Sequence, residues 1–160
     1  MSELDVAGKS LVTTPAEREI HIERIVDAPR DRVFAAHTDP ELIPQWWGPR
    51  RTTTVVEELD ARTGGAWRFL MRDEDGSEIV FRGIFREVTA PERIVQTFEW
   101  DGMPGYVSVE TANFEDLGDR TRIVSTSIFH TPEERDGMIE SGMETGMNET
   151  FARLDELLAK

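Results

Sequence analysis

The sequence contains no cysteine, a single tyrosine and only three histidines. The absence of cysteine excludes disulfide bridges, thiolate zinc sites and thiol nucleophiles, and it is typical of a reducing compartment. We therefore expect a cytoplasmic protein. The histidines are the usual acid–base groups near neutral pH, but they lie far apart in the chain, at His21, His37 and His130. The sequence gives no reason to place them in one site.

Positive charge is also scarce. Lys and Arg number 18 against 32 Asp and Glu, so the formal net charge is -14. Such a surface repels the phosphate backbone of nucleic acids and anionic membrane surfaces. No apolar run approaches the roughly 20 residues that cross a bilayer, and residues 1–19 show no signal-peptide pattern. We expect neither nucleic-acid binding nor membrane insertion.

Familiar catalytic and metal-binding motifs are missing as well. The sequence has no His-Glu-x-x-His pair, no glycine-rich phosphate loop and no nucleophile elbow. Its many carboxylates follow from the composition and do not by themselves predict a metal site. We expect no cofactor and no metal, and the motifs identify no catalytic residue.

What the sequence does contain is a regular succession of short strands. Residues 19–26 alternate apolar and polar types, as in a half-buried strand. Six further strands are predicted at 52–59, 65–72, 78–88, 93–100, 105–115 and 121–130, with turns that carry Gly, Asp or Pro between them. This succession predicts an antiparallel meander and about seven strands in all.

Helix signals flank the strands. Two short helices are predicted after the first strand, one following Asp27-Ala28-Pro29 and one following Asp39-Pro40-Glu41. A capping box at Thr131-Pro132-Glu133-Glu134 begins a long C-terminal helix. Its apolar stripe advances in steps of three and four residues and consists of Ile139, Met143, Met147, Phe151, Leu154 and Leu158.

A chain of 160 residues suits one domain. Residues 1–17 show no periodicity, so we interpret them as a flexible N-terminal arm before a single domain at 18–160. Only the terminal helix is long enough to cover the concave face of the sheet. The sequence therefore predicts an α+β helix-grip fold, in which a curved antiparallel sheet of about seven strands wraps around a long C-terminal helix.

The order of elements and several short motifs resemble the stand-alone bacterial homologues of the heat-shock protein 90 ATPase activator. The motifs are Asp27-Ala28-Pro29, Val33-Phe34, Thr38-Asp39-Pro40-Glu41, Trp46-Trp47-Gly48-Pro49, Gly64-Gly65 and Gly142-Met143-Glu144-Thr145-Gly146. That family belongs to the START-related (SRPBCC) ligand-binding superfamily, together with polyketide cyclases and birch-pollen-allergen-like proteins. The resemblance implies a helix-grip fold from about residue 18 and an internal cavity. It does not imply one reaction, because the superfamily shares a cavity and not a chemistry.

The candidate ligand-binding residues lie mainly at alternating positions of the predicted strands. Trp67, Phe69 and Met71 alternate with arginines, which places the bulky groups on the concave side. Small-molecule pockets are lined mainly by such groups, although the same stripe is also ordinary core material. The full set of candidates is Trp46, Trp67, Phe69, Met71, Phe81, Phe85, Phe98, Trp100, Tyr106, Met143 and Met147.

Two local patterns leave alternatives open. The Trp46-Trp47 pair either forms a lid over the cavity or seals an edge of the core. Gly142 and Gly146 each cost about 1 kcal/mol relative to alanine inside a helix. We therefore expect a packing or cavity reason for these glycines.

Tyr106 and either Glu99 or Glu110 are candidates for acid–base chemistry on the central strands. The residue patterns there are too mixed to assign faces. A carboxylate that faced inward would have a raised pKa and could transfer protons in an aldol-type cyclisation. One that faced outward would be ordinary surface.

Three functions from different classes remain open. The first is binding of a small hydrophobic or amphipathic ligand in the cavity. The second is a cavity-based enzyme of polyketide cyclase or lyase type, and the third is a chaperone or stress-response interaction module. The protein is expected to be a monomer or a homodimer, since edge strands allow pairing and the net charge opposes it.

Overall fold

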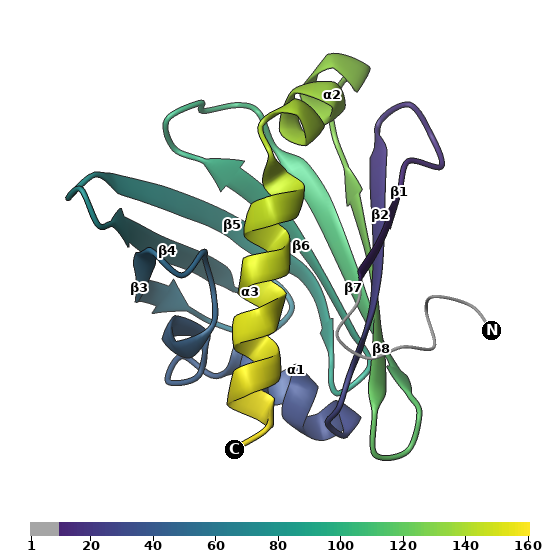
Figure 1. Cartoon of the computed structure of the whole chain (residues 1–160). Helices are drawn as coiled ribbons and strands as arrows, with labels where there is room; N and C mark the ends of the chain where they lie inside the picture. The colour runs from purple at the N-terminus through teal and green to yellow at the C-terminus, as the bar shows by residue number, and fades with distance from the viewer. Residues whose placement is uncertain (1–9) are drawn as a thin grey trace.

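The computed structural model describes residues 10–160 and shows an eight-stranded antiparallel sheet that curves around a C-terminal helix (Figure 1). The strands are β1 (Ser10–Thr13), β2 (Glu19–Val26), β3 (Thr52–Leu59), β4 (Ala66–Asp73), β5 (Glu78–Thr89), β6 (Arg93–Trp100), β7 (Ser108–Asp116) and β8 (Thr121–Ile128). Their order in the sheet is β1-β2-β8-β7-β6-β5-β4-β3. The predicted meander is confirmed, because β3 to β8 pair in chain order and β2 joins β8.

The N-terminal segment differs from the prediction. Ser10–Thr13 forms β1 and pairs with β2 in antiparallel register, from Ser10 opposite Arg24 to Thr13 opposite His21. The expectation of a flexible arm is therefore wrong for these residues, while residues 1–9 lie outside the described part of the chain. The segment is too short to show periodicity, but Val12 and Thr13 are β-branched and suit a strand. It gives the sheet one strand more than predicted.

The helices are α1 (Arg30–Thr38), the 3-10 helix η2 (Ile43–Gln45), α2 (Pro132–Glu140) and α3 (Met143–Leu158). The two short helices after β2 are as predicted. The long terminal helix is interrupted between Glu140 and Met143, so that two helices replace one. The predicted start is correct, since the Glu134 backbone N–H donates to Thr131 Oγ1 at 3.1 Å, and Pro132 follows as the first helical residue.

Gly142 explains the interruption. Its φ is 82°, in the left-handed region that favours glycine, and it is the N-cap of α3. Gly142 therefore has a conformational role in place of the expected packing or cavity role. Gly146 lies inside α3 and approaches the loop after η2, where a Cβ would meet Pro49 Cγ at 3.8 Å.

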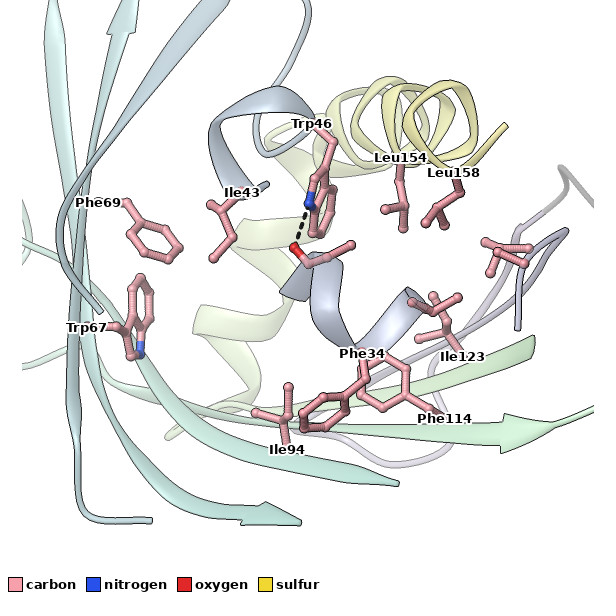
Figure 2. Close-up of a cluster of buried hydrophobic side chains, with 14 of the residues drawn as sticks. Phe34, Ile43, Trp46, Trp67, Phe69, Ile94, Phe114, Ile123, Leu154 and Leu158 are labelled. Carbon is pink, nitrogen blue, oxygen red and sulfur yellow. Dashed lines mark hydrogen bonds between the residues drawn. The ribbon is translucent and has the colours of Figure 1, made fainter. Parts of the chain in front are cut away.

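The helix–sheet interface is filled with side chains near the C-terminal end of α3. Leu154 and Leu158 are buried there with Phe34 of α1 and Phe114 of β7, whose rings meet edge to face at 5.5 Å (Figure 2). Trp46 belongs to this cluster, and its indole N–H donates to the Ala36 carbonyl of α1 at 2.9 Å. Helix α1 thus fills one end of the space under the sheet.

A buried arginine joins the edge of the sheet to α3. Arg24 of β2 is only 4% exposed and donates to Ser10 Oγ and Asp155 Oδ2, both at 2.7 Å. Its guanidinium also lies 5.0 Å from the centre of the Phe151 ring. A buried cation needs such partners to offset the loss of hydration. Arg24 therefore connects β1, β2 and α3.

Candidate functional site

A cavity of about 480 Å³ lies between the sheet and the N-terminal half of α3. Its lining includes Met143, Gly146, Met147, Thr150 and Phe151 from α3, and it ends where Leu154 begins the packed core. The volume falls within the range of about 300–1,000 Å³ that is typical of small-molecule sites. A space of this size therefore separates the sheet from the N-terminal half of α3.

Aromatic rings form one wall of the cavity. Trp67 and Phe69 of β4 have ring centroids 4.9 Å apart, and Trp67 lies 5.7 Å from Phe98 of β6. Phe81 of β5 lies 5.1 Å from Phe98. The wall follows from the alternation predicted for β4, since Phe69 pairs with Phe81 across the sheet and both project to the concave side.

Gly83 makes room for the largest of these rings. It pairs with Trp67 in the register of β4 and β5. A Cβ at this position would overlap the Trp67 indole and the Thr97 carbonyl oxygen. The indole N–H donates to that same oxygen at 3.2 Å. Glycine is therefore needed here for the close approach, and it fixes the orientation of Trp67.

The two tryptophans after η2 have different environments. Trp46 is 5% exposed and its hydrogen bond to Ala36 makes it a seal of the core edge, although it also borders the cavity. Trp47 extends the aromatic wall, with its ring edge-to-face against Phe69 at 5.2 Å and Phe81 at 5.4 Å. The loop that carries both is held to α3 by Arg153, which donates to the Gly48 carbonyl at 2.8 Å.

Most of the sequence-predicted candidates meet in this cavity, and two do not. Trp100 is 40% exposed at the end of β6, where its ring packs against Gly102. Tyr106 is 54% exposed and precedes β7, which begins at Ser108 instead of the predicted 105. Both assignments to the lining are therefore corrected. The candidates that line the cavity are Trp46, Trp67, Phe69, Met71, Phe81, Phe85, Phe98, Met143 and Met147; their role in ligand binding stays a prediction.

One carboxylate faces the cavity. Glu110 of β7 accepts a hydrogen bond from Ser127 Oγ at 3.3 Å. Burial raises the pKa of Glu110 from its ordinary value of 4.5 to about 7, and the Ser127 hydrogen bond offsets part of that rise. A carboxyl group with this pKa exchanges protons readily near neutral pH. The open question about the faces of the central strands is thus answered for Glu110.

Glu99 lies on the other side of the sheet. Its carboxylate accepts from Arg82 Nε at 3.1 Å and from the backbone N–H of Gly105 at 2.6 Å. The hydrogen bond from Gly105 is the main cause that lowers the pKa of Glu99, followed by that from Arg82. Glu99 is therefore ionised and outside the cavity, and Tyr106 has no place beside Glu110 in acid–base chemistry.

His37 is the one histidine on the cavity lining. Its Nδ1–H donates to the Val33 carbonyl at 2.8 Å, and its ring lies 4.8 Å from Trp46 and 5.0 Å from Phe114. Burial lowers the pKa of His37 from 6.5 to about 4, against a smaller opposing effect of the Val33 hydrogen bond. The ring is therefore neutral at physiological pH.

Metal-binding geometry is not found in residues 10–160, where no three His, Cys, Asp or Glu side chains gather closely enough to hold an ion. In the same residues, no helix has the length and apolarity to span a membrane. The residues that line the cavity offer apolar contact, hydrogen bonding and proton exchange at Glu110.

The architecture defines a class of protein, the α+β helix-grip fold, in which a curved antiparallel sheet surrounds a terminal helix and a cavity lies between them. The chain belongs to the family described as Activator of Hsp90 ATPase homolog 1-like protein, whose model matches residues 27–159. This family assignment confirms the resemblance inferred from the motifs. A comparison with curated proteins finds no match.

Solved structures support the fold. A protein from Rhodobacter sphaeroides is 23% identical with a TM-score of 0.88, over 94% of this chain and 99% of its own. A protein from Arthrobacter aurescens is 28% identical with a TM-score of 0.86, over 93% of this chain and 91% of its own. An HSP90 activator from Plasmodium falciparum is 22% identical with a TM-score of 0.54, over 69% of this chain and 72% of its own. At identities of this level the first and third likenesses concern the fold alone.

Proposed function

We propose that this protein binds a small hydrophobic or amphipathic molecule in the cavity between α3 and the sheet. The observation that carries the proposal is the cavity itself, about 480 Å³ with an aromatic wall on the sheet side. Methionines from α2 and α3, including Met138, Met143 and Met147, border the other side. Methionine side chains are flexible and polarizable, so they adapt to ligands of different shape.

The energetics favour an apolar occupant. A two-ring aromatic ligand that buries about 250 Å² of apolar surface gains about 6 kcal/mol at 25 cal/mol per Å². Part of that gain offsets the lost translational and rotational freedom of the ligand. We therefore expect affinities for simple probes in the micromolar to millimolar range, with natural ligands binding more tightly through additional polar contacts.

Gly146 offers a way to test the cavity without damaging the fold. It lines the cavity from within α3, and a Cβ there would make only ordinary contact with Pro49. Gly146→Leu should fill part of the space and also favour the helix by up to about 1 kcal/mol. Gly137→Leu in α2 is the matched control, because Gly137 has open space around it and does not line the cavity.

The experiment is a titration with the neutral fluorescent probe N-phenyl-1-naphthylamine, alongside native mass spectrometry of the freshly purified protein. We expect saturable fluorescence enhancement for the wild type and for Gly137→Leu, and weaker binding by at least tenfold for Gly146→Leu. A co-purified hydrophobic molecule would identify the ligand class directly. Equal probe binding by the two variants, or no saturable binding at all, would contradict the proposal.

A cavity-based enzyme of cyclase or lyase type is the second candidate, and Glu110 is the observation that favours it. A carboxyl group with a pKa of about 7 inside an apolar cavity suits general acid–base catalysis. Turnover of a bound compound that ceases in Glu110→Gln would support this candidate. A chaperone partner stays a hypothesis from the family name alone, and a pull-down free of chaperone would contradict it.

A further inference from the structure

A row of polar side chains crosses the concave face of the sheet inside the cavity. Gln96 of β6 pairs with Glu110 of β7, and Glu110 pairs with Ser127 of β8. Residues directly opposite one another in an antiparallel sheet project to the same face. All three line the cavity, and the row ends at Phe85 of β5 on one side and Ile20 of β2 on the other.

The row has hydrogen-bonding capacity that the protein does not use. Ser127 is the only hydrogen-bond partner of the Glu110 carboxyl among residues 10–160, and the Gln96 side chain has none. A carboxylate has about four lone-pair sites, and the Gln96 amide has two N–H donors and a carbonyl acceptor. Polar groups inside a protein are normally paired. This row therefore offers an adjacent donor and acceptor to whatever enters the cavity.

The charge of the lining limits what that group can be. Glu110 and His37 are the only titratable side chains among the described residues that border the cavity, and no lysine or arginine borders it. His37 is neutral, because burial lowers its pKa to about 4. Burial raises the pKa of Glu110 to about 7. Among residues 10–160, an anionic ligand group would thus meet no positively charged side chain in the lining and, above neutral pH, would meet a carboxylate of like sign.

We infer that Gln96, Glu110 and Ser127 form a recognition site for the hydroxyl group of an otherwise apolar ligand, a hydrophobic alcohol or phenol. The ligand O–H donates to the Glu110 carboxylate, and the ligand oxygen accepts from the Gln96 amide. When Glu110 is protonated, its own O–H donates to the ligand oxygen, so the hydroxyl is accepted in both states. This inference rests on the proposed binding function and specifies its ligand class.

A matched series of probes with one aromatic body tests the assignment. The four compounds are 2-naphthalenemethanol, 2-methylnaphthalene, 2-naphthoate and 2-naphthylmethylamine, and the measurement is a calorimetric or NMR titration at pH 8. We expect the alcohol to bind at least tenfold more tightly than the methyl compound, which is the factor that one or two ordinary hydrogen bonds supply. The naphthoate should bind the most weakly.

Three variants connect the preference to the row. Glu110→Leu removes the acceptor of the row and Gln96→Leu removes the donor. In each variant the affinity for the alcohol should lie within about threefold of the affinity for the methyl compound. Glu99→Leu is the matched control, because Glu99 is a glutamate on the next strand that pairs with Arg82 outside the cavity. It should keep the wild-type ratio. If Glu110→Leu does not fold, Gln96→Leu and the four probes on the wild type still test whether the row recognises the hydroxyl group.

The possible outcomes separate the inference from the function on which it rests. If all four probes bind to the wild type with similar affinity, the inference is overturned and the binding function stands. If the amine or the naphthoate binds most tightly, the hydroxyl assignment is wrong. If the preference for the alcohol survives in both Glu110→Leu and Gln96→Leu, the row is not the source of that preference. If none of the probes binds, both the inference and the proposed function fail.

Discussion

The two halves of α3 contact the same sheet in different ways. In the C-terminal half, Leu154 is fully buried and Leu158 is 5% exposed against a packed cluster. In the N-terminal half, Met143 and Met147 are half-buried and face the cavity. One helix therefore supplies close packing at one end and an open space at the other. The comparison shows that the same helix borders the cavity with its N-terminal half and completes the core cluster with its C-terminal half.

Helix α1 is the physical cause of the difference. It brings Val33 and Phe34 under the sheet, where Phe34 meets Phe114 and the two leucines of α3 complete the cluster. At the other end, no helix among residues 10–160 packs under the sheet in this way, since α2 buries none of its residues. Gly146 also removes side-chain volume there. Packing density thus falls along the helix within about three turns.

The largest expected effect comes from truncating the packed end. Leu154→Ala removes a fully buried side chain and should lower the free energy of unfolding by about 4 kcal/mol, because the surrounding core cannot collapse onto the space. Met147→Ala should cost less, about 1 kcal/mol, because Met147 is only partly buried and borders the cavity instead of the packed core. Urea unfolding measures both. Equal costs would mean that the two halves of α3 do not differ in packing.

The pH dependence of stability should identify Glu110 as the titrating group of the cavity end. Its folded-state pKa of about 7 lies above the ordinary 4.5, so folding favours the protonated form. The contribution of Glu110 to the free energy of unfolding is fully present below pH 4.5. It falls by up to about 3 kcal/mol as the pH rises through 7. Glu110→Gln should therefore be more stable than the wild type at pH 8 and similar to it at pH 4.

Glu99→Gln is the control for this measurement, because the Glu99 carboxylate has a lowered pKa and lies outside the cavity. Relative to the wild type, Glu99→Gln should not become more stable as the pH rises from 4 to 8. A Glu110→Gln variant with the same pH profile as the wild type would show that water in the cavity solvates the carboxylate and prevents the shift.

His37, which borders the cavity beside Trp46 and Phe114, should have a pH effect on stability of the opposite sign, and a smaller one between pH 7 and pH 5. Its folded-state pKa of about 4 lies below the ordinary 6.5, so its contribution is complete above pH 6.5 and is lost as the pH falls toward 4. Between pH 7 and pH 5 the wild type should lose about 2 kcal/mol relative to His37→Phe. Unfolding titrations of the two proteins at both pH values test this, and parallel losses would contradict it.

Much of the fold could be predicted from the sequence because the strands have clear local patterns. The bounds of β2, β3 and β6 equal the predicted ranges 19–26, 52–59 and 93–100, and Trp67, Phe69 and Met71 lie on the expected face. The missed features depend on context that a pattern does not carry. Ser10–Thr13 is too short for periodicity, and Gly142 interrupts a helix only because its φ is positive.

The candidate site shows a similar division. Residue type predicts Trp100 and Tyr106 as lining residues of the cavity. Both are exposed because β6 ends at Trp100 and β7 begins only after Tyr106. The face of Glu110 had a usable signal, since Ala112 and Phe114 follow it at alternate positions and are apolar. Gln96 likewise alternates with Ile94 and Phe98. That Gln96 lies opposite Glu110 could not be predicted from the sequence. It depends on the register of β6 and β7, which contacts between residues distant in the sequence determine.

Strand β1 has a consequence for any shortened version of this protein. A chain that started at Arg18 would lose the partner of β2 and the hydroxyl of Ser10, which accepts from Arg24. The edge of the sheet would then move from the four-residue β1 to the eight-residue β2, which is a longer template for pairing with other molecules. We expect such a truncated protein to aggregate, although the family match begins only at residue 27. We therefore expect the foldable unit to extend beyond the homologous region, into β1 and β2.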